Sequence, residues 1–506
     1  MSSTFKINTI GVVGCGAMGR GIVQIAALAG CTVRLFDAAP GAAAAAAQAL
    51  AETFAKLQEK GKLTAEAIDA ARQRIQVAAS LEDLADCDTV IEAIIENIGI
   101  KQAVFKQLEA IVRPDAILAS NTSSLSITAI AAGCTHPERV AGYHFFNPVP
   151  VMRVVEVIDG VLTAAWVGEA LMALARTMGH TPVRAKDTPG FIVNHAGRGF
   201  GTEALRIVGE GVTDFVTVDR ILRDAAGFKL GPFELMDLTG LDVSHPVMES
   251  IYHQYYEEPR YRPSVITAQR LTAGLLGRKT KRGFYAYVDG KQQAPAEVSA
   301  PAARPVSIWV SGEWQWACEQ VQELVVQLGG QLDHGRLPGP DSLIVVMPLG
   351  DDASFIAARD GLDATRVVAL DLLTPLAKRR TLMTTPATTA ATRDAALGLF
   401  SSDGVPVSVI RDSAGFVAPR VIATIVNIAC DIAQQRIASP TDIDLAVTLG
   451  LGYPQGPLAM GDTYGPRRIL TILESMNELY ADPRYRASPW LKRRALLGLS
   501  LLDDEL

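Results

Sequence analysis

The sequence predicts an α/β domain with a parallel sheet, then an all-α domain, and then a second, weaker pair of the same kind. Three observations predict this order. Residues 8–140 alternate short β-branched runs with helical patterns, which is typical of a parallel sheet covered by helices on both faces. From about residue 187, long amphipathic helical patterns are broken by Gly-Pro turns. Several motifs of this helical region then recur in the same order near the end of the chain.

Composition excludes some classes of partner. The chain has 506 residues, of which 49% are apolar and 20% charged, with a net charge of −7. This charge disfavours binding to nucleic acid or to an anionic membrane. We find no secretory leader and no apolar run long enough to cross a membrane, so we expect a cytoplasmic protein without a membrane partner. The six cysteines lack disulfide or metal spacing, and no bound metal is expected.

The elements of the first domain are expected in a regular order. A strand at TIGVVG (9–14) precedes a helix through Ile22–Leu28 and a strand at TVRLFD (32–37). An Ala-rich helix should follow the turn at Pro40-Gly41, because Ala is the strongest helix former. The remaining strand candidates are DTVIEAI, AILASN and RVAGYHF.

A glycine motif after the first strand indicates a nucleotide site. Gly14 would permit a tight turn, Gly16 the approach of the backbone to a pyrophosphate, and Gly19 close helix–strand packing. The pyrophosphate would lie on the positive end of the helix, beside Ala17 and Met18. Strand, glycines, helix and strand follow in the order of a Rossmann-type dinucleotide domain. The alternative is a nucleotide-shaped fold that binds no nucleotide.

Asp37 predicts which dinucleotide binds. It ends the second strand, at the distance from the glycines that is typical of a ribose-binding carboxylate. An acidic side chain there accepts hydrogen bonds from the ribose 2′-OH and repels a 2′-phosphate. No Arg follows that could receive such a phosphate, so NAD is favoured over NADP. The second half of the chain lacks the glycines, which predicts one NAD per chain.

The segment Tyr143–Ile158, YHFFNPVPVMRVVEVI, supplies a candidate acid–base pair. We interpret His144 as lying in a loop ahead of a β-branched run that carries Glu156. Histidine takes and returns a proton near neutral pH, and a carboxylate on its other ring nitrogen would fix the tautomer. A lone His in an Asn/Pro-rich loop is otherwise more often structural, but the nucleotide motif favours the catalytic interpretation.

Four helical-region motifs recur in register, which predicts a duplicated all-α domain. Residues 306–405 resemble a degenerate copy of the nucleotide-binding domain. In this copy SIWVSGEWQW takes the place of TIGVVGCGAMG, and SLIVVMPLGDD takes the place of DTVIEAIIEN. The expected domains are 1–186 (nucleotide-binding), 187–290 (helical), 306–407 (degenerate Rossmann-like) and 408–506 (helical), with a linker at 291–305. The recurring motifs are Asp187–Phe191 with Asp412–Phe416, Gly227–Phe233 with Gly452–Leu458, Asp237 with Asp462, and Pro259–Arg262 with Pro483–Arg486.

The chain resembles the L-3-hydroxyacyl-CoA dehydrogenase family over about 1–285 and, weakly, over 410–500. It looks most like the long bacterial 3-hydroxybutyryl- or 3-hydroxyadipyl-CoA dehydrogenases, including those of phenylacetate breakdown. The motifs that carry the resemblance are GVVGCGAMG, IEAIIEN, SNTSSLSIT, HFFNPVPVM, VVEVI, KDTPGFIVN and GRKTKRGFY.

The resemblance implies a role for each site residue. His144 would remove the proton of the 3-hydroxyl, and Glu156 would orient the ring and stabilise its charge. Ser123 would bond near the substrate oxygen and the nicotinamide, and Asn194 would hold the developing carbonyl and the thioester. The further implied contacts are Asp37, Glu96, Lys101, Asn121 and Lys279 for NAD, and Thr53 and Lys60 for the CoA part of an acyl-CoA thioester.

The chain departs from the family pattern at two positions. His195 stands where the family usually has Arg, and Lys281 where it commonly has Gly. Neither position touches the proposed chemistry. A terminal carboxylate on the acyl group would need a cation, for which Arg198 and Arg206 are candidates by position alone.

Three alternatives remain open from the sequence. The chain could be a dehydrogenase of a small hydroxy or sugar acid without CoA, or a non-catalytic, crystallin-like NAD-binding protein.

It could form a homodimer, or its two helical copies could pack on each other within one chain. In the register of the repeat, Asn194 is matched by Pro419, and AKRRTLMTTPATTA (377–390) contains neither His nor Glu. One active site per chain is therefore predicted, centred on His144.

Overall fold

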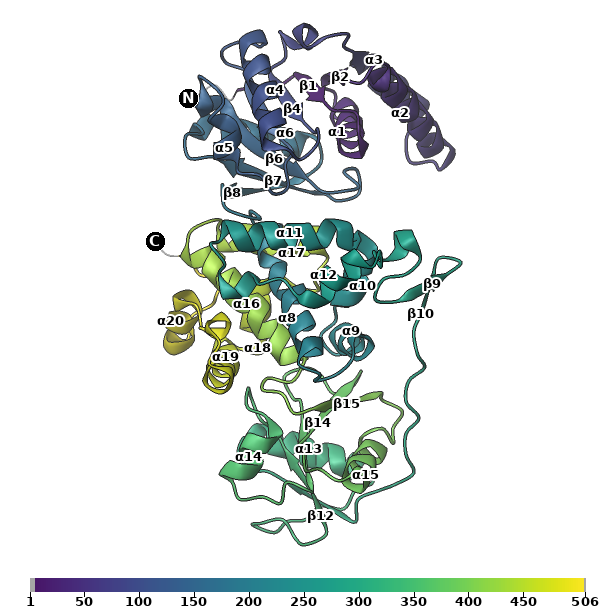
Figure 1. The fold of residues 1–506 in the computed structure, drawn as a ribbon, viewed down its shortest axis with the longest axis vertical. Helices are drawn as coiled ribbons and strands as arrows, with labels where there is room; N and C mark the ends of the chain where they lie inside the picture. The colour runs from purple at the N-terminus through teal and green to yellow at the C-terminus, as the bar shows by residue number, and fades with distance from the viewer. Residues whose placement is uncertain (1–4, 505–506) are drawn as a thin grey trace. The chain divides into compact units, whose positions relative to one another are not determined.

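The computed structural model describes residues 5–504 (Figure 1). They form two compact units. The first unit runs through Ala196 and also contains Gln435–Gly452. The second unit consists of Gly197–Gln434 and residues 453–504. The segment 435–452, from the second helical copy, thus packs with the first unit. The five-part division expected from the sequence stays a prediction.

The first unit contains an eight-stranded sheet in the order β3-β2-β1-β4-β5-β6-β7-β8. Neighbouring strands are parallel from β3 through β6, which confirms the expected parallel sheet. Beyond that region β6 and β7 are antiparallel, and β8 is again parallel to β7. The segment that joins β6 to β7, 146–153, is too short for a crossover helix. The strands are β1 (Thr9–Val13), β2 (Thr32–Phe36), β3 (Ile75–Val77), β4 (Thr89–Glu92), β5 (Ile117–Ser120), β6 (Val140–Phe145), β7 (Val154–Asp159) and β8 (Thr181–Lys186).

Helices cover both faces of this sheet, as expected. Alternate strand residues enter two separate apolar clusters, with Ile117 and Ala119 in one and Leu118 in the other. The Ala-rich helix α2 pairs with α3 beside α1 (Figure 1). The helices are α1 (Ala17–Leu28), α2 (Ala42–Glu59), α3 (Ala65–Arg74), α4 (Ile98–Ile111), α5 (Ile127–Ala131), α6 (Ala165–Thr177), α7 (Val193–Ala196) and α17 (Pro440–Leu451).

The second unit contains most of both helical copies, which pack on each other through α8 and α16. The fully buried Arg420 on α16 lies 2.5 Å from the buried carboxylate of Glu203 on α8. Arg260 donates to the carbonyl of Arg486 at 2.6 Å, and Arg484 donates to that of Pro259 at 3.1 Å. The helices are α8 (Arg198–Gly209), α9 (Phe215–Asp224), α10 (Pro232–Thr239), α11 (Leu241–Gln254), α12 (Val265–Thr272), α16 (Ala418–Gln434), α18 (Pro457–Tyr464), α19 (Pro466–Tyr480) and α20 (Pro489–Leu497).

A five-stranded sheet in the second unit repeats one edge of the first sheet. Its order is β11-β12-β13-β14-β15, and only β13 and β14 are antiparallel, as β6 and β7 are. The elements are β11 (Ser307–Val310), α13 (Gln315–Gln327), β12 (Ser342–Val346), α14 (Ala353–Arg359), β13 (Val367–Leu370), β14 (Arg380–Thr384), α15 (Ala390–Phe400) and β15 (Val407–Arg411). A hairpin of β9 (Ala286–Val288) and β10 (Lys291–Gln293) precedes them.

The repeated aspartates fix the correspondence between the two sheets. Asp187 accepts hydrogen bonds from backbone groups at the start of α5, and Asp412 does the same at the start of α14. The strand before α14, β12, therefore corresponds to β5. Matching SLIVVMPLGDD to DTVIEAIIEN was wrong, because the strand in SLIVVMPLGDD is β12, and the place of β4 beside it is taken by β11. Among residues 5–504, no helix is long and apolar enough to cross a membrane.

Candidate active site

The glycine loop between β1 and α1 has the shape that a dinucleotide requires. Gly14 has φ +107°, and a Cβ on it would lie 2.6 Å from the carbonyl oxygen of Ala93. A Cβ on Gly19 would lie 1.9 Å from the carbonyl oxygen of Gly14. A Cβ on Gly16, by contrast, would meet nothing within 4 Å. The first and third glycines are thus required by packing, and open space in front of the second lets a phosphate approach the start of α1.

Asp37 lies against this loop. Its carboxylate accepts hydrogen bonds from the backbone N–H of Cys15 at 2.7 Å and of Ala39 at 2.9 Å. Burial and the charge of Asp37 raise the pKa of the Cys15 thiol to about 12, so the thiol stays neutral. The carboxylate is therefore held at the end of β2, where a ribose would meet it.

Replacing Asp37 with Ala should raise the KM for NAD by about 10- to 100-fold, because a hydrogen bond to a charged group contributes about 1.5–3 kcal/mol. The KM for NADP should rise less, since the repulsion of a 2′-phosphate is lost as well. Steady-state kinetics with each cofactor measure both values. An unchanged KM for NAD would show that Asp37 does not bind the ribose.

A buried ion pair shapes the loop after β5. Lys101 lies 2.6 Å from Glu92 and 3.3 Å from Glu96, and the side chains of Lys101 and Glu92 are buried. Glu96 in turn accepts from the Thr122 hydroxyl at 2.5 Å and from the backbone N–H of Ser123 at 2.9 Å. Although burial opposes ionisation, Lys101 and these donors lower the pKa of Glu96. Glu92 was not predicted from the sequence. The feature that could have indicated it is a carboxylate at the end of a buried strand.

The ends of β5 and β6 are joined by Asn121. Its side-chain oxygen accepts from the backbone N–H of Phe145 at 2.8 Å. This bond places the loop that carries Ser123 next to the strand that carries His144. The Ser123 hydroxyl makes no hydrogen bond to any residue in the range 5–504.

His144 and Glu156 form a buried pair across two strands. They lie directly opposite each other on β6 and β7, with Nδ1 of His144 2.6 Å from Oε2 of Glu156. A carboxylate accepts hydrogen bonds, so the contact assigns the ring proton to Nδ1 and leaves Nε2 as the basic nitrogen. The expectation that His144 lies in a loop was wrong, because the Asn-Pro-Val-Pro run begins only after β6 has ended.

Helix α7 holds the other side of Glu156. The second carboxylate oxygen accepts from the backbone N–H groups of Ile192 and Val193, both at 2.9 Å. The same helix carries Asn194, whose side-chain amide donates to the carbonyl of Ser123 at 3.3 Å. The structure thus places the four residues predicted to be catalytic on neighbouring elements. The pair sits where β6, β7 and α7 meet, beside the loop after β5.

The other predicted contacts belong to other elements of the chain. Thr53 is on α2, and Lys60 is exposed just beyond its end. Lys279 belongs to the second unit, where it pairs with Asp242 at 2.5 Å. Arg206, also in the second unit, already forms ion pairs with Glu210 and Asp482. Arg198 lies there too, and burial lowers its pKa to about 10. The departures from the family pattern are a fully buried His195 and Lys281 with φ +59°, a conformation that favours glycine.

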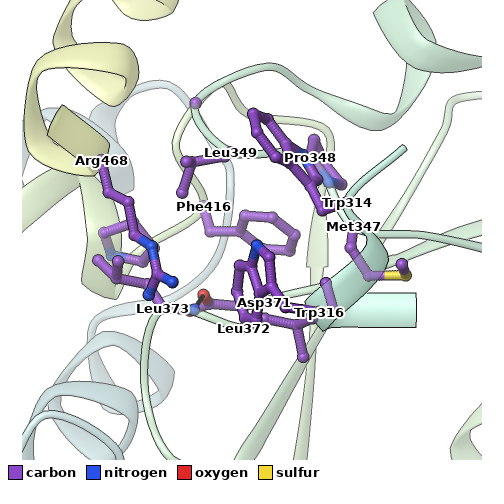
Figure 2. A pocket seen from close by; sticks show the side chains of 13 residues that line it. Trp314, Trp316, Met347, Pro348, Leu349, Asp371, Leu372, Leu373, Phe416 and Arg468 are labelled. Carbon is purple, nitrogen blue, oxygen red and sulfur yellow. Dashed lines mark hydrogen bonds between the residues drawn. The ribbon is translucent and has the colours of Figure 1, made fainter. Parts of the chain in front are cut away.

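The second unit has a counterpart of this site without the acid–base pair. Pairing of β14 with β15 puts Thr381 at the position of Glu156, and the backbone N–H of Asp371 donates to its carbonyl at 3.1 Å. Asp371 therefore stands where His144 does. The cavity there is about 20 Å³, and Figure 2 shows that Trp314 and Trp316 are among the side chains lining it. Its wall includes Pro419, the counterpart of Asn194.

Comparison with known proteins gives matches for both kinds of domain. The family model for the 3-hydroxyacyl-CoA dehydrogenase NAD binding domain matches residues 9–188. The model for the 3-hydroxyacyl-CoA dehydrogenase C-terminal domain matches residues 190–287 and again 415–500. These matches confirm the resemblance, NAD as the cofactor and the duplication of the helical domain.

Individual relatives agree with these models. A 3-hydroxyadipyl-CoA dehydrogenase of Escherichia coli (strain K12) is 37% identical over 497 residues, covering 97% of this chain and 98% of its own. The crystal structure of a 3-hydroxybutyryl-CoA dehydrogenase from Escherichia coli K12 matches with a TM-score of 0.86 at 35% identity, covering 97% of this chain and 99% of that one. A probable 3-hydroxybutyryl-CoA dehydrogenase of Bacillus subtilis (strain 168) is 43% identical, covering 56% of this chain and 98% of its own.

Proposed function

The chain belongs to the 3-hydroxyacyl-CoA dehydrogenase family, and from that premise we propose that it oxidises a short-chain (S)-3-hydroxyacyl-CoA to the 3-oxoacyl-CoA. Candidate substrates are 3-hydroxybutyryl-CoA and 3-hydroxyadipyl-CoA, the acyl groups in the names of its relatives. The observation that carries the proposal is the buried contact between His144 and Glu156. A pair of this kind in a unit that also carries a dinucleotide loop suits the oxidation of a hydroxyl group.

The proposed chemistry uses each side chain once. Nε2 of His144 removes the proton of the 3-hydroxyl, and the resulting imidazolium is stabilised through Nδ1 by Glu156. NAD, held by the glycine loop and Asp37, would supply the acceptor for the hydride that leaves C3 of the substrate. The Ser123 hydroxyl and the Asn194 amide donate to the oxygen that becomes the carbonyl. The reverse reaction returns the proton from His144, so oxidation gains from higher pH.

Some of the proposed residues would touch the cofactor or CoA directly, and others would act through a neighbouring residue. Asp37, Asn121 and the glycine loop would touch NAD, whereas the buried Lys101 would act through Glu96. Thr53 and Lys60 are separated by two turns of α2 and would share one face toward the CoA part. The full set proposed for NAD within the first unit is Gly14, Gly16, Ala17, Met18, Gly19, Asp37, Glu96, Lys101, Asn121 and Ser123.

The direct test is consumption of NADH with acetoacetyl-CoA as the substrate. We expect turnover with this thioester and none with free acetoacetate. Oxidation of a free hydroxy acid without activity on the thioester would favour the dehydrogenase that does not use CoA. Binding of NADH without any turnover would favour the non-catalytic protein. Catalytic efficiencies for 3-hydroxybutyryl-CoA and 3-hydroxyadipyl-CoA then decide the acyl group.

We further propose a cytoplasmic enzyme whose helical copies form a pseudo-dimer within one chain. The packing of α8 on α16 supports this arrangement, because each copy meets the other through a buried ion pair. A homodimer of the whole chain remains compatible with it.

A further inference from the structure

A segment of the second helical copy belongs to the catalytic unit. The carbonyl of Ile437 accepts from the backbone N–H of Lys186, the last residue of β8, at 2.9 Å. The equivalent bond exists in the second unit, where the carbonyl of Val212 accepts from the N–H of Arg411 at 3.0 Å. Val212 matches Ile437, and Arg411 matches Lys186, in the register of the repeat. The exchange is reciprocal, because each helical copy pairs with the sheet of the other half.

The helix in this segment, α17, contacts α7, β7 and β8. On this helix Gly450 faces Val193: a Cβ on Gly450 would lie 3.1 and 3.2 Å from the two methyl groups of Val193 and 3.7 Å from a methyl of Val154. Val193 donates its N–H to Glu156, and Val154 lies just before Glu156 on the same face of β7. A side chain at position 450 would therefore press on both elements that hold the carboxylate.

The repeat supplies an independent comparison. Glycine inside a helix is less favourable than alanine, so Gly450 weakens α17. In the register of the repeat, Gly450 is matched by Ala225, at the end of α9. That copy of the helix lies in the second unit, where Arg379 pairs with Asp224 at 2.8 Å. Alanine is thus used in the second unit, and glycine is used where the helix meets Val193.

We propose that α17 is a positioning element of the active site, and that Gly450 sets the placement of α7 and with it the orientation of Glu156 and Asn194. The inference rests on the proposed function. It gives the second half of the chain a part in catalysis although that half lacks the acid–base pair. Gly450 is a positioning residue, because it acts through Val193 and touches no reacting group.

The test replaces Gly450 with Val and with Ala. A displacement of catalytic groups by about 1 Å costs as much as about 100-fold, so we expect kcat to fall about 10-fold or more for Gly450→Val and about 2- to 5-fold for Gly450→Ala. The KM for NAD should stay within about twofold, because the glycine loop and Asp37 lie on other strands. Adding Val193→Ala to Gly450→Val removes the two opposing methyl groups and should restore most of the lost kcat.

Leu449→Val is the matched control, because Leu449 is 37% exposed on the same helix and also receives a β-branched residue. It should leave kcat unchanged. The inference is wrong if Gly450→Val keeps kcat within twofold of the parent, or if Val193→Ala restores nothing. If Gly450→Val does not fold, kcat is measured instead for Gly450→Ala with and without Val193→Ala. The inference is then wrong if Gly450→Ala keeps kcat within twofold of the parent, or if Val193→Ala restores nothing. Inactivity of the parent chain would instead refute the proposed function.

Discussion

Replacing His144 with Ala is expected to lower turnover by about two to four orders of magnitude, the usual contribution of a general base. The ring removes the substrate proton through Nε2. No other imidazole can replace it, because the carboxylate that orients the ring, Glu156, contacts residue 144. Binding of NADH should persist, since the glycine loop and Asp37 are untouched. The measurement is kcat with acetoacetyl-CoA, together with NADH binding followed by fluorescence.

His136 offers a matched control for this substitution. Its ring also lies near a carboxylate, with Nδ1 3.2 Å from Glu138, but both side chains are more than half exposed. His136→Ala should leave kcat and NADH binding unchanged. If His144→Ala retained turnover within a factor of ten, His144 would be a structural histidine and the proposed mechanism would be wrong.

The features that could be predicted from sequence are those encoded by short-range patterns. Gly14 and Asp37 belong to one strand–loop–helix–strand unit, so their spacing carries the geometry of the loop. His144 and Glu156 are close in the sequence, and the antiparallel pairing of β6 with β7 brings them face to face. The duplication was readable because Asp187 and Asp412 keep the same capping function.

The features that were missed depend on packing between distant segments. Glu92 looks like any residue ending a buried strand until Lys101 folds back onto it from α4. The contact of Gly450 with Val193 joins two helices from opposite halves of the sequence. Hydrophobic period and local propensity encode which face of an element is buried, but they do not encode which other element covers it.

The second half of the chain offers a prediction about stability. Asp371, the residue that corresponds to His144, has a buried carboxyl group. One oxygen accepts from the backbone N–H of Leu373 at 2.9 Å, and the other has no hydrogen-bond partner among residues 5–504. Burial raises the pKa of Asp371 to about 7, partly offset by that hydrogen bond. Folding therefore favours the neutral acid. The stability contributed by this group is complete below the unfolded pKa of about 3.9 and is lost as pH rises to about 7.

Asp371→Asn removes this dependence, because an amide does not ionise. One pKa unit corresponds to about 1.4 kcal/mol, so the stability of the variant relative to the parent should rise by about 2–3 kcal/mol between pH 5 and pH 8. Urea denaturation at the two pH values measures the change, and the constant cost of burying an amide cancels in the comparison.

Asp333→Asn is the control for that measurement and works in the opposite sense. Hydrogen bonds from Ser342, Gly339 and Gly335 lower the pKa of Asp333 to about 2, so its contribution is lost only as pH falls through that value. Between pH 5 and pH 8 the effect of Asp333→Asn should be constant. If Asp371→Asn were equally constant, the carboxyl would be ionised in the fold and must have a partner. If it follows pH while turnover at His144 is unchanged, the counterpart site carries a neutral acid that serves no catalytic step.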